Sequence, residues 1–126
     1  IKENPFFGVG AGSFTEIFFL HTNFWKGHSH NLLFELSISY GLPATIIFFI
    51  STTNILYLSS KKIFPNKMKI DTNYIDRAFW TALFFFLISQ LADVQYFDGK
   101  ISLITWILMA GLKNIILDKN YRTEAQ

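Results

Sequence analysis

The sequence has no cysteine, few charges and little excess of either sign. The absence of Cys from its 126 residues excludes a secreted module held together by disulfides. Charged residues make up 16% of the chain, against about 25% in soluble domains, so the usual polar coat is missing. A formal net charge of +2 is too small to indicate nucleic-acid binding. What is present is apolar: 51% of the residues are hydrophobic and 15 are Phe, which also excludes a disordered protein.

Three apolar runs predict membrane-spanning helices. The charged residues that bound them are Glu35 and Lys61 for the first run, Arg77 and Asp93 for the second, and Lys100 and Lys113 for the third. A spanning helix needs about 20 mostly apolar residues. The first run meets that length, the second needs flanking apolar residues, and the third needs Lys113 to reach the headgroups. The predicted fold is therefore all-α, a multi-span membrane bundle with three transmembrane helices.

The basic residues predict which side of the membrane each loop faces. Five of the 11 basic residues lie in the 59–77 segment, beside two acidic ones. Lys and Arg gather on the cytoplasmic side of short loops. The predicted order is an outer loop at 1–30, helix entry and span one at 31–60, a cytoplasmic loop at 61–73, span two at 74–92, an outer turn at 93–100, span three at 101–117 and a cytoplasmic tail at 118–126. Because no signal-peptide pattern follows Ile1, we expect the chain to be the C-terminal part of one membrane domain of a longer protein.

Local signals predict how the outer loop and the helices begin and end. The segment NPFFGVGAGSF is predicted to be a loop, because Gly8, Gly10 and Gly12 permit positive φ or close backbone approach. A Gly-x-Gly run can hold phosphate, but the dinucleotide motif also needs a strand before it and a helix after it. A tight turn at the membrane surface is therefore favoured. Further signals are a short interfacial helix at 15–20, N-caps at Ser29 or Asn31, a kink at Gly41-Leu42-Pro43, a capping box at Asn73 with Asp76, and a turn at Asp98-Gly99.

All three histidines, His21, His28 and His30, lie close together in the predicted outer loop. Imidazole changes charge near neutral pH. The positive end of a helix keeps such a ring neutral and attracts an anion such as phosphate. A base beside a phosphate site suits group transfer from a phosphorylated donor to a hydroxyl. The alternative is a polar loop whose imidazoles meet only water and headgroups.

Metal binding is a further interpretation of the same histidines. Zinc takes three or four ligands, and Asp93 or Asp98 could complete a site. Nothing in the spacing requires one, and no metal is predicted. Asp93 directly follows an apolar run, where a carboxylate is costly unless it faces water or a partner. It could orient an imidazole, hold an acceptor hydroxyl, or simply end a helix in water.

The motifs NPFFGVGAGSF and HSHNLLFELSISYGLPATIIFF closely resemble the C-terminal part of the O-antigen ligase and polymerase superfamily, which are multi-span bacterial membrane enzymes. The family pattern is Pro-x-x-Gly-x-Gly, an outer loop, His-Asn, an apolar helix and a Gly-Leu-x-Gly-like break. Its positions in this sequence are Pro5, Gly8 and Gly10, then His30-Asn31, then Gly41-Leu42. The match covers residues 4–50, and the later spans agree only in character.

The resemblance implies transfer of a glycan from an undecaprenyl-diphosphate carrier to an acceptor hydroxyl, on the periplasmic face of the bacterial inner membrane and without a metal or other cofactor. The implied partners are a lipid-linked oligosaccharide donor, a glycan or lipid acceptor, and membrane lipids. His30 would be the general base. The supporting positions would be His28, Asn31, Asp93 and Asp98, with Gly8, Gly10 and Gly12 in a loop that faces the substrate.

The sequence departs from the family in its arginines. Family members hold the diphosphate with arginines of outer loops, whereas Arg77 and Arg122 both fall on the predicted cytoplasmic side. We therefore expect those arginines upstream of Ile1 and expect this chain alone to be inactive. A transporter or channel with pH-sensing outer histidines is the alternative, and the absence of an ionisable residue mid-span disfavours it. A membrane scaffold without chemistry is the third hypothesis.

Overall fold

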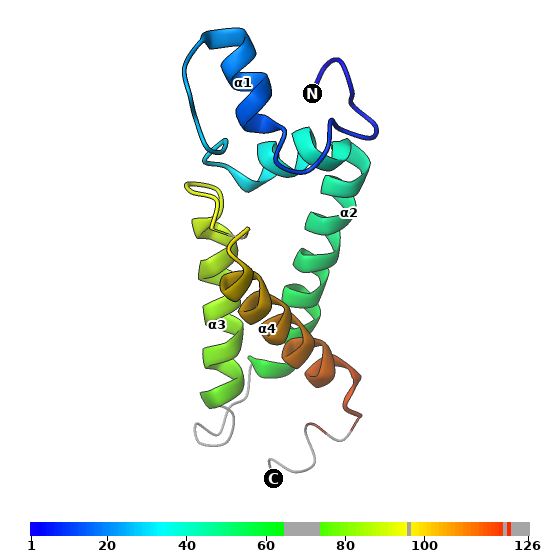
Figure 1. Ribbon diagram of the computed structural model, residues 1–126. Helices are drawn as coiled ribbons and strands as arrows, with labels where there is room; N and C mark the ends of the chain where they lie inside the picture. The colour runs from blue at the N-terminus through cyan, green and yellow to red at the C-terminus, as the bar shows by residue number, and fades with distance from the viewer. Residues whose placement is uncertain (65–73, 96, 120, 122–126) are drawn as a thin grey trace. The chain divides into compact units, whose positions relative to one another are not determined.

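The computed structural model describes residues 1–64, 74–95, 97–119 and 121. The described residues form four helices and no strand, which confirms the all-α fold (Figure 1). The helices are α1 (Phe14–Thr22), α2 (Leu32–Ile63), α3 (Tyr74–Ser89) and α4 (Gly99–Leu117). The chain divides into two compact units, each with its own apolar cluster: Ile1–Ile50 with Ile88–Phe97, and Ser51–Leu87 with Asp98–Gln126.

Helix α1 is the short helix predicted at 15–20, extended at both ends. It ends at Asn23, which takes the left-handed conformation with φ 57° and donates its N–H to the Phe19 carbonyl. Asn tolerates this conformation better than most residues, so the polar residue after the apolar run ends the helix.

Helix α2 begins where the N-cap signal predicts. The Asn31 side-chain oxygen accepts hydrogen bonds from the N–H groups of Leu33 at 3.0 Å and Phe34 at 3.4 Å. Glu35, buried in the first turn, accepts the Ser29 N–H at 2.8 Å. These bonds satisfy donors that have no partner within the helix, and they fix the loop that precedes it.

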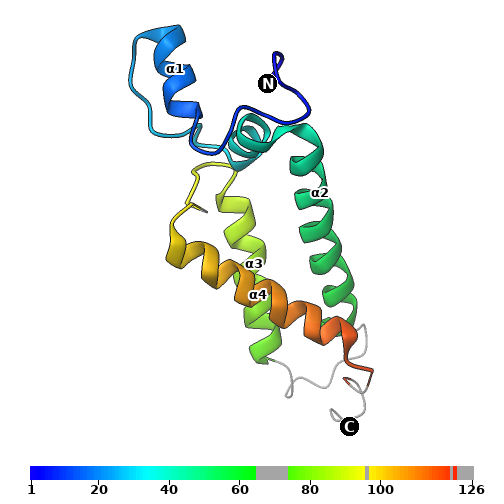
Figure 2. The same cartoon turned by 45° about the vertical axis from the view of Figure 1, so that its right-hand side comes forward.

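The predicted break in α2 lies at Gly41, whose φ of 83° and ψ of 168° are not helical. Pro43 has no N–H to continue the ladder, and the Leu42 N–H instead donates to the Pro5 carbonyl at 2.8 Å. A Cβ at Gly41 would overlap the Phe6 carbonyl, so only glycine fits. Helix α2 changes direction in its first half in both views (Figures 1 and 2).

The glycine loop supplies the hydrogen bonds that the break removes from α2. The Ile38 carbonyl accepts the Val9 N–H at 2.8 Å, and the Ser39 carbonyl accepts the Gly10 N–H at 3.1 Å. Gly8, with φ 67°, lies so close to these two carbonyl groups that a Cβ would overlap them. The loop and the break therefore form one structure.

The second unit is built around an apolar cluster. Its buried members are Ile63, Leu83, Met109 and Leu112. Trp80 of α3 packs against this cluster and donates its ring N–H to the Leu56 carbonyl at 2.9 Å. Lys62 donates to the carbonyls of Ile115 at 3.0 Å and Asp118 at 2.6 Å. Its ammonium group thus provides a hydrogen-bond donor for carbonyls at the C-terminal end of α4.

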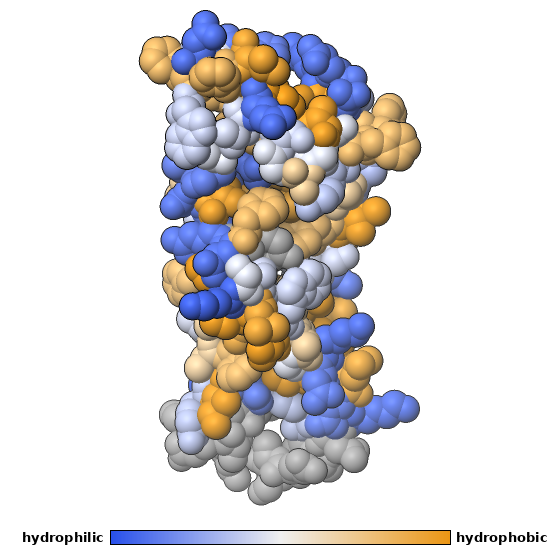
Figure 3. Space-filling view, in the orientation of Figure 1, coloured by the Kyte–Doolittle hydropathy of each residue, from blue (hydrophilic) through white to orange (hydrophobic). Residues whose placement is uncertain are grey.

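Two helices of the described chain are long and apolar enough to cross a membrane: α2, with 32 residues, and α4, with 19. Within their most apolar windows, 33% and 17% of the residues are buried in the chain. Helix α3, with 16 residues, falls short of the roughly 20 that a span needs, so a third span stays a prediction. Apolar side chains lie exposed on the face shown in Figure 3.

Two positions named in the sequence analysis lie outside the described residues. They are Asn73, the predicted helix cap, and Arg122.

Candidate functional site

The turn after α3 is hydrogen bonded to the start of α2. Helix α3 ends at Ser89, and the next two carbonyls turn toward α2. The Gln90 carbonyl accepts the Leu32 N–H at 2.9 Å, and the Leu91 carbonyl accepts the Asn31 side-chain N–H at 2.9 Å. Asn31 thus caps α2 with its oxygen and holds the turn with its nitrogen.

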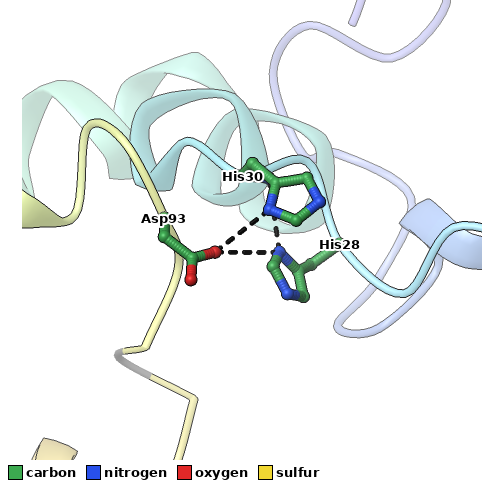
Figure 4. A group of neighbouring side chains, drawn as sticks. All are labelled: His28, His30 and Asp93. Carbon is green, nitrogen blue, oxygen red and sulfur yellow. Dashed lines mark hydrogen bonds and ion pairs between the residues drawn. The ribbon is translucent and has the colours of Figure 1, made fainter.

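This pairing brings Asp93 beside His30. The Nδ1 atom of His30 lies 3.1 Å from Oδ1 of Asp93, and the same oxygen accepts the Val94 N–H at 2.9 Å. A carboxylate only accepts hydrogen bonds, so Nδ1 of His30 carries the proton of the neutral ring. Its Nε2 atom keeps a free lone pair and faces away from Asp93 (Figure 4).

The His30 hydrogen bond lowers the pKa of Asp93 below its ordinary value of 3.8. Local desolvation opposes this effect, while the Val94 N–H and the charges of the two imidazoles add to it. The carboxylate is therefore ionised at neutral pH. It is open to water, since its side chain is 53% exposed and that of His30 is 50% exposed.

His28 completes the cluster from the same loop. Its Nδ1 atom lies 3.8 Å from Oδ1 of Asp93 and accepts the His30 backbone N–H at 3.3 Å. The two imidazole centroids are 4.3 Å apart, with the rings inclined at 62°. His30 holds a φ of 55°, a left-handed conformation that few residues other than glycine adopt. Backbone strain of this kind concentrates at functional sites.

The other predicted site residues do different things in the structure. His21 bonds through Nδ1 to the Ile17 carbonyl at 2.8 Å, within α1, and is not part of the cluster. Asp98 caps α4, accepting the N–H groups of Lys100 at 2.9 Å and Ile101 at 3.2 Å. Asp93, and not Asp98, is thus the carboxylate that pairs with His30.

The glycine loop has a structural role that its sequence did not reveal. The N–H groups of Val9 and Gly10 are engaged by α2, and Gly8 donates to the Asn4 carbonyl at 3.1 Å. Gly12, with φ 76°, is exposed and has open space around it. A contact of this loop with substrate stays a prediction.

A pocket of about 250 Å³ lies between this loop and α1 in the first unit, and it was not predicted. Its lining is mostly apolar, with Val9, Phe18 and Ile38 among the residues. Glu3 and His21 supply polar groups. No single motif marks it, because its walls come from three segments.

Comparison of the chain with protein-family models, with curated proteins and with solved structures found no match. The resemblance to the ligase and polymerase superfamily therefore rests on the motifs quoted above. The functional interpretation rests on those motifs and on the chemistry of the His28, His30 and Asp93 cluster.

Proposed function

We propose that this chain carries the general base of a membrane glycan transferase, which moves a glycan from an undecaprenyl-diphosphate carrier to an acceptor hydroxyl at the periplasmic face. The observation that carries the proposal is the 3.1 Å pairing of His30 with Asp93, which leaves Nε2 of His30 as a free acceptor. The carrier and the acceptor come from the resemblance of the His-Asn and glycine-loop motifs to the ligase and polymerase superfamily.

The proposed reaction uses the free ring nitrogen. Nε2 of His30 takes the proton of the acceptor hydroxyl while that oxygen forms a bond to C1 of the donor sugar. The bond from C1 to the diphosphate oxygen breaks, and the carrier diphosphate leaves with the electron pair. The resulting imidazolium is stabilised by the Asp93 carboxylate at Nδ1 and returns its proton to the leaving diphosphate or to water. Cationic groups elsewhere in the protein stabilise the diphosphate, and we expect these to be arginines.

The position of His30 supports this role. It stands immediately before the Asn31 cap, at the positive end of α2. The same end of the helix favours an anionic donor nearby. Asp93 acts as a positioning residue, because its Oδ1 atom fixes both the tautomer and the direction of the His30 ring.

The membrane setting of the proposal is supported by α2 and α4, which are long and apolar enough to span a bilayer. The 59–77 segment holds five of the 11 basic residues, which favours its placement on the cytoplasmic side. The His30 loop would then lie on the periplasmic side. Orientation can be measured by cysteine labelling, because the chain contains no native Cys.

The test replaces His30 in the protein encoded by the complete reading frame. His30→Ala should lower glycan transfer at least about 100-fold, because general base catalysis contributes roughly 100- to 10,000-fold. Transfer is measured as the mobility shift of the acceptor on gels, and membrane insertion is measured in the same cells. His21→Ala is the matched control, since that imidazole lies outside the cluster. Near-normal transfer by His30→Ala would remove His30 from this role.

A further inference from the structure

The cluster that orients His30 also has the geometry of a metal site. Nδ1 of His28, Nδ1 of His30 and a carboxylate oxygen of Asp93 all lie within 4.8 Å of one another. Both ring nitrogens turn toward the same carboxylate, as Figure 4 shows. We propose that these three side chains bind a zinc ion, and that zinc bound there inhibits glycan transfer. The binding stands on the geometry alone, whereas the inhibition rests on the proposed function.

The spacing of the three ligand atoms suits zinc. Tetrahedral zinc with N and O ligands at about 2.0–2.2 Å places neighbouring ligand atoms roughly 3.3 Å apart. The atoms of His30 and Asp93 are 3.1 Å apart, and those of His28 and Asp93 are 3.8 Å apart. All three atoms lie within 4.8 Å of one another, so side-chain rotations that bring the two ring nitrogens closer together would place the three atoms around one ion. The fourth position would hold water, since the side chains of these residues are 38% to 53% exposed.

The donor set also selects the type of metal. Two imidazole nitrogens with one carboxylate suit zinc and other late first-row ions, whereas magnesium and calcium prefer oxygen ligands. Binding requires the lone pair of each Nδ1 atom, so the imidazoles must be deprotonated there. Nδ1 of His28 carries a lone pair rather than a proton, because it accepts the His30 N–H, and zinc would replace that hydrogen bond.

Zinc and base catalysis place incompatible demands on His30. As the proposed base, the ring holds its proton on Nδ1, against Asp93, and uses the Nε2 lone pair. With zinc on Nδ1, the single proton of the neutral ring sits on Nε2, which can no longer accept one. His28 differs, since it provides a metal ligand but takes no proton in the proposed transfer. Variants of His28 therefore separate the two activities of the cluster.

The binding experiment uses the protein of the complete reading frame, purified in detergent and stripped of metal. Zn²⁺ is titrated in competition with a chromophoric zinc indicator, with Mg²⁺ as the control ion. We expect one zinc per protein. His28→Ala, His28→Gln and Asp93→Asn should each weaken its affinity at least tenfold, while His21→Ala should not change it. Circular dichroism confirms that each variant keeps its helices.

The inhibition experiment measures glycan transfer over a range of zinc concentrations, and each variant is compared with its own zinc-free rate. Zinc should inhibit the parent protein, and His28→Gln should raise the half-inhibiting concentration at least tenfold. Zinc affinity that is unchanged in both His28 variants overturns the metal site. Zinc bound with the expected dependence, in a protein that transfers no glycan without zinc, supports the site and overturns the proposed function.

Discussion

The two units of the chain differ in the regularity of their backbone. Every positive-φ residue among those described lies in the first unit: Gly8, Gly10, Gly12, Asn23, His30 and Gly41. In the second unit the helices are regular, and its cluster is apolar. In the first, the cluster has three buried residues, against four in the second, and backbone hydrogen bonds join the glycine loop to α2. The comparison teaches that irregular backbone gathers in the unit that holds the candidate site, whereas the described helices of the other unit have no residue with positive φ.

The sharpest way to break this comparison is to exchange one glycine in each unit. Gly41→Ala should destabilise the protein by more than about 2 kcal/mol, because the new Cβ overlaps Phe6 at a left-handed φ. Gly111→Ala, in α4, should be neutral or stabilise by up to about 1 kcal/mol, because its Cβ makes only ordinary contact with Phe79. Thermal unfolding in detergent measures both variants. Equal effects would contradict the difference between the units.

The two aspartates provide the next test. Asp93→Asn should reduce glycan transfer roughly 100-fold, because an amide can offer an N–H to Nδ1 and favour the wrong tautomer of His30. Asp98→Asn should leave transfer within about twofold, since Asn caps a helix as well as Asp does. Initial rates of transfer at saturating acceptor measure the difference. A loss of the same size in both variants would show that the carboxylate beside His30 has no special role.

A substitution at Asn31 tests whether glycan transfer depends on the hydrogen bond from Asn31 to the turn after α3. Asn31→Asp keeps the oxygen that caps α2 but loses the N–H that bonds to the Leu91 carbonyl. Transfer should fall about fivefold, in line with the roughly 1 kcal/mol of a hydrogen bond, while helix content is unchanged. Circular dichroism and transfer rates are measured on one preparation. Full activity would mean that Asp93 reaches His30 without this bond.

The smallest effect is a dependence on pH. The pKa of Asp93 is lowered in the folded protein, so its ionisation contributes stability that is present above pH 3.8 and is lost as the pH falls through the folded-state value. In His30→Ala, the pKa should return toward 3.8, because the His30 hydrogen bond is the main cause of the shift. Carboxyl ¹³C shifts report the midpoint directly. A midpoint at or above 3.8 in the parent protein would contradict this assignment.

Features with a local cause could be predicted from the sequence. The start of α2 follows from the Asn31 cap, and its break follows from Gly41 beside Pro43. The choice between Asp93 and Asp98 could not be predicted in this way. It depends on hydrogen bonds from Leu32 and Asn31 to the turn after α3, which join segments far apart in the chain.

The point at which helix α3 ends could not be predicted, for the same reason. Nothing within the apolar run shows that the carbonyls of Gln90 and Leu91 leave α3 to bond with α2. The conformations of Gly8 and Gly10 were predictable as loop conformations, but their partners in α2 were not. Hydropathy and local signals locate elements, whereas the contacts that build the site come from tertiary structure.

The closure of the α2 break by the glycine loop has a consequence for anyone who recombines such sequences. The carbonyls of Ile38 and Ser39 accept hydrogen bonds from the N–H groups of Val9 and Gly10, and the Leu42 N–H donates to the Pro5 carbonyl. A chimaera that grafts a foreign loop onto this helix would leave these three backbone groups without the hydrogen-bond partners that they have here. Residues 5–10 and 38–42 must therefore be exchanged as one cassette.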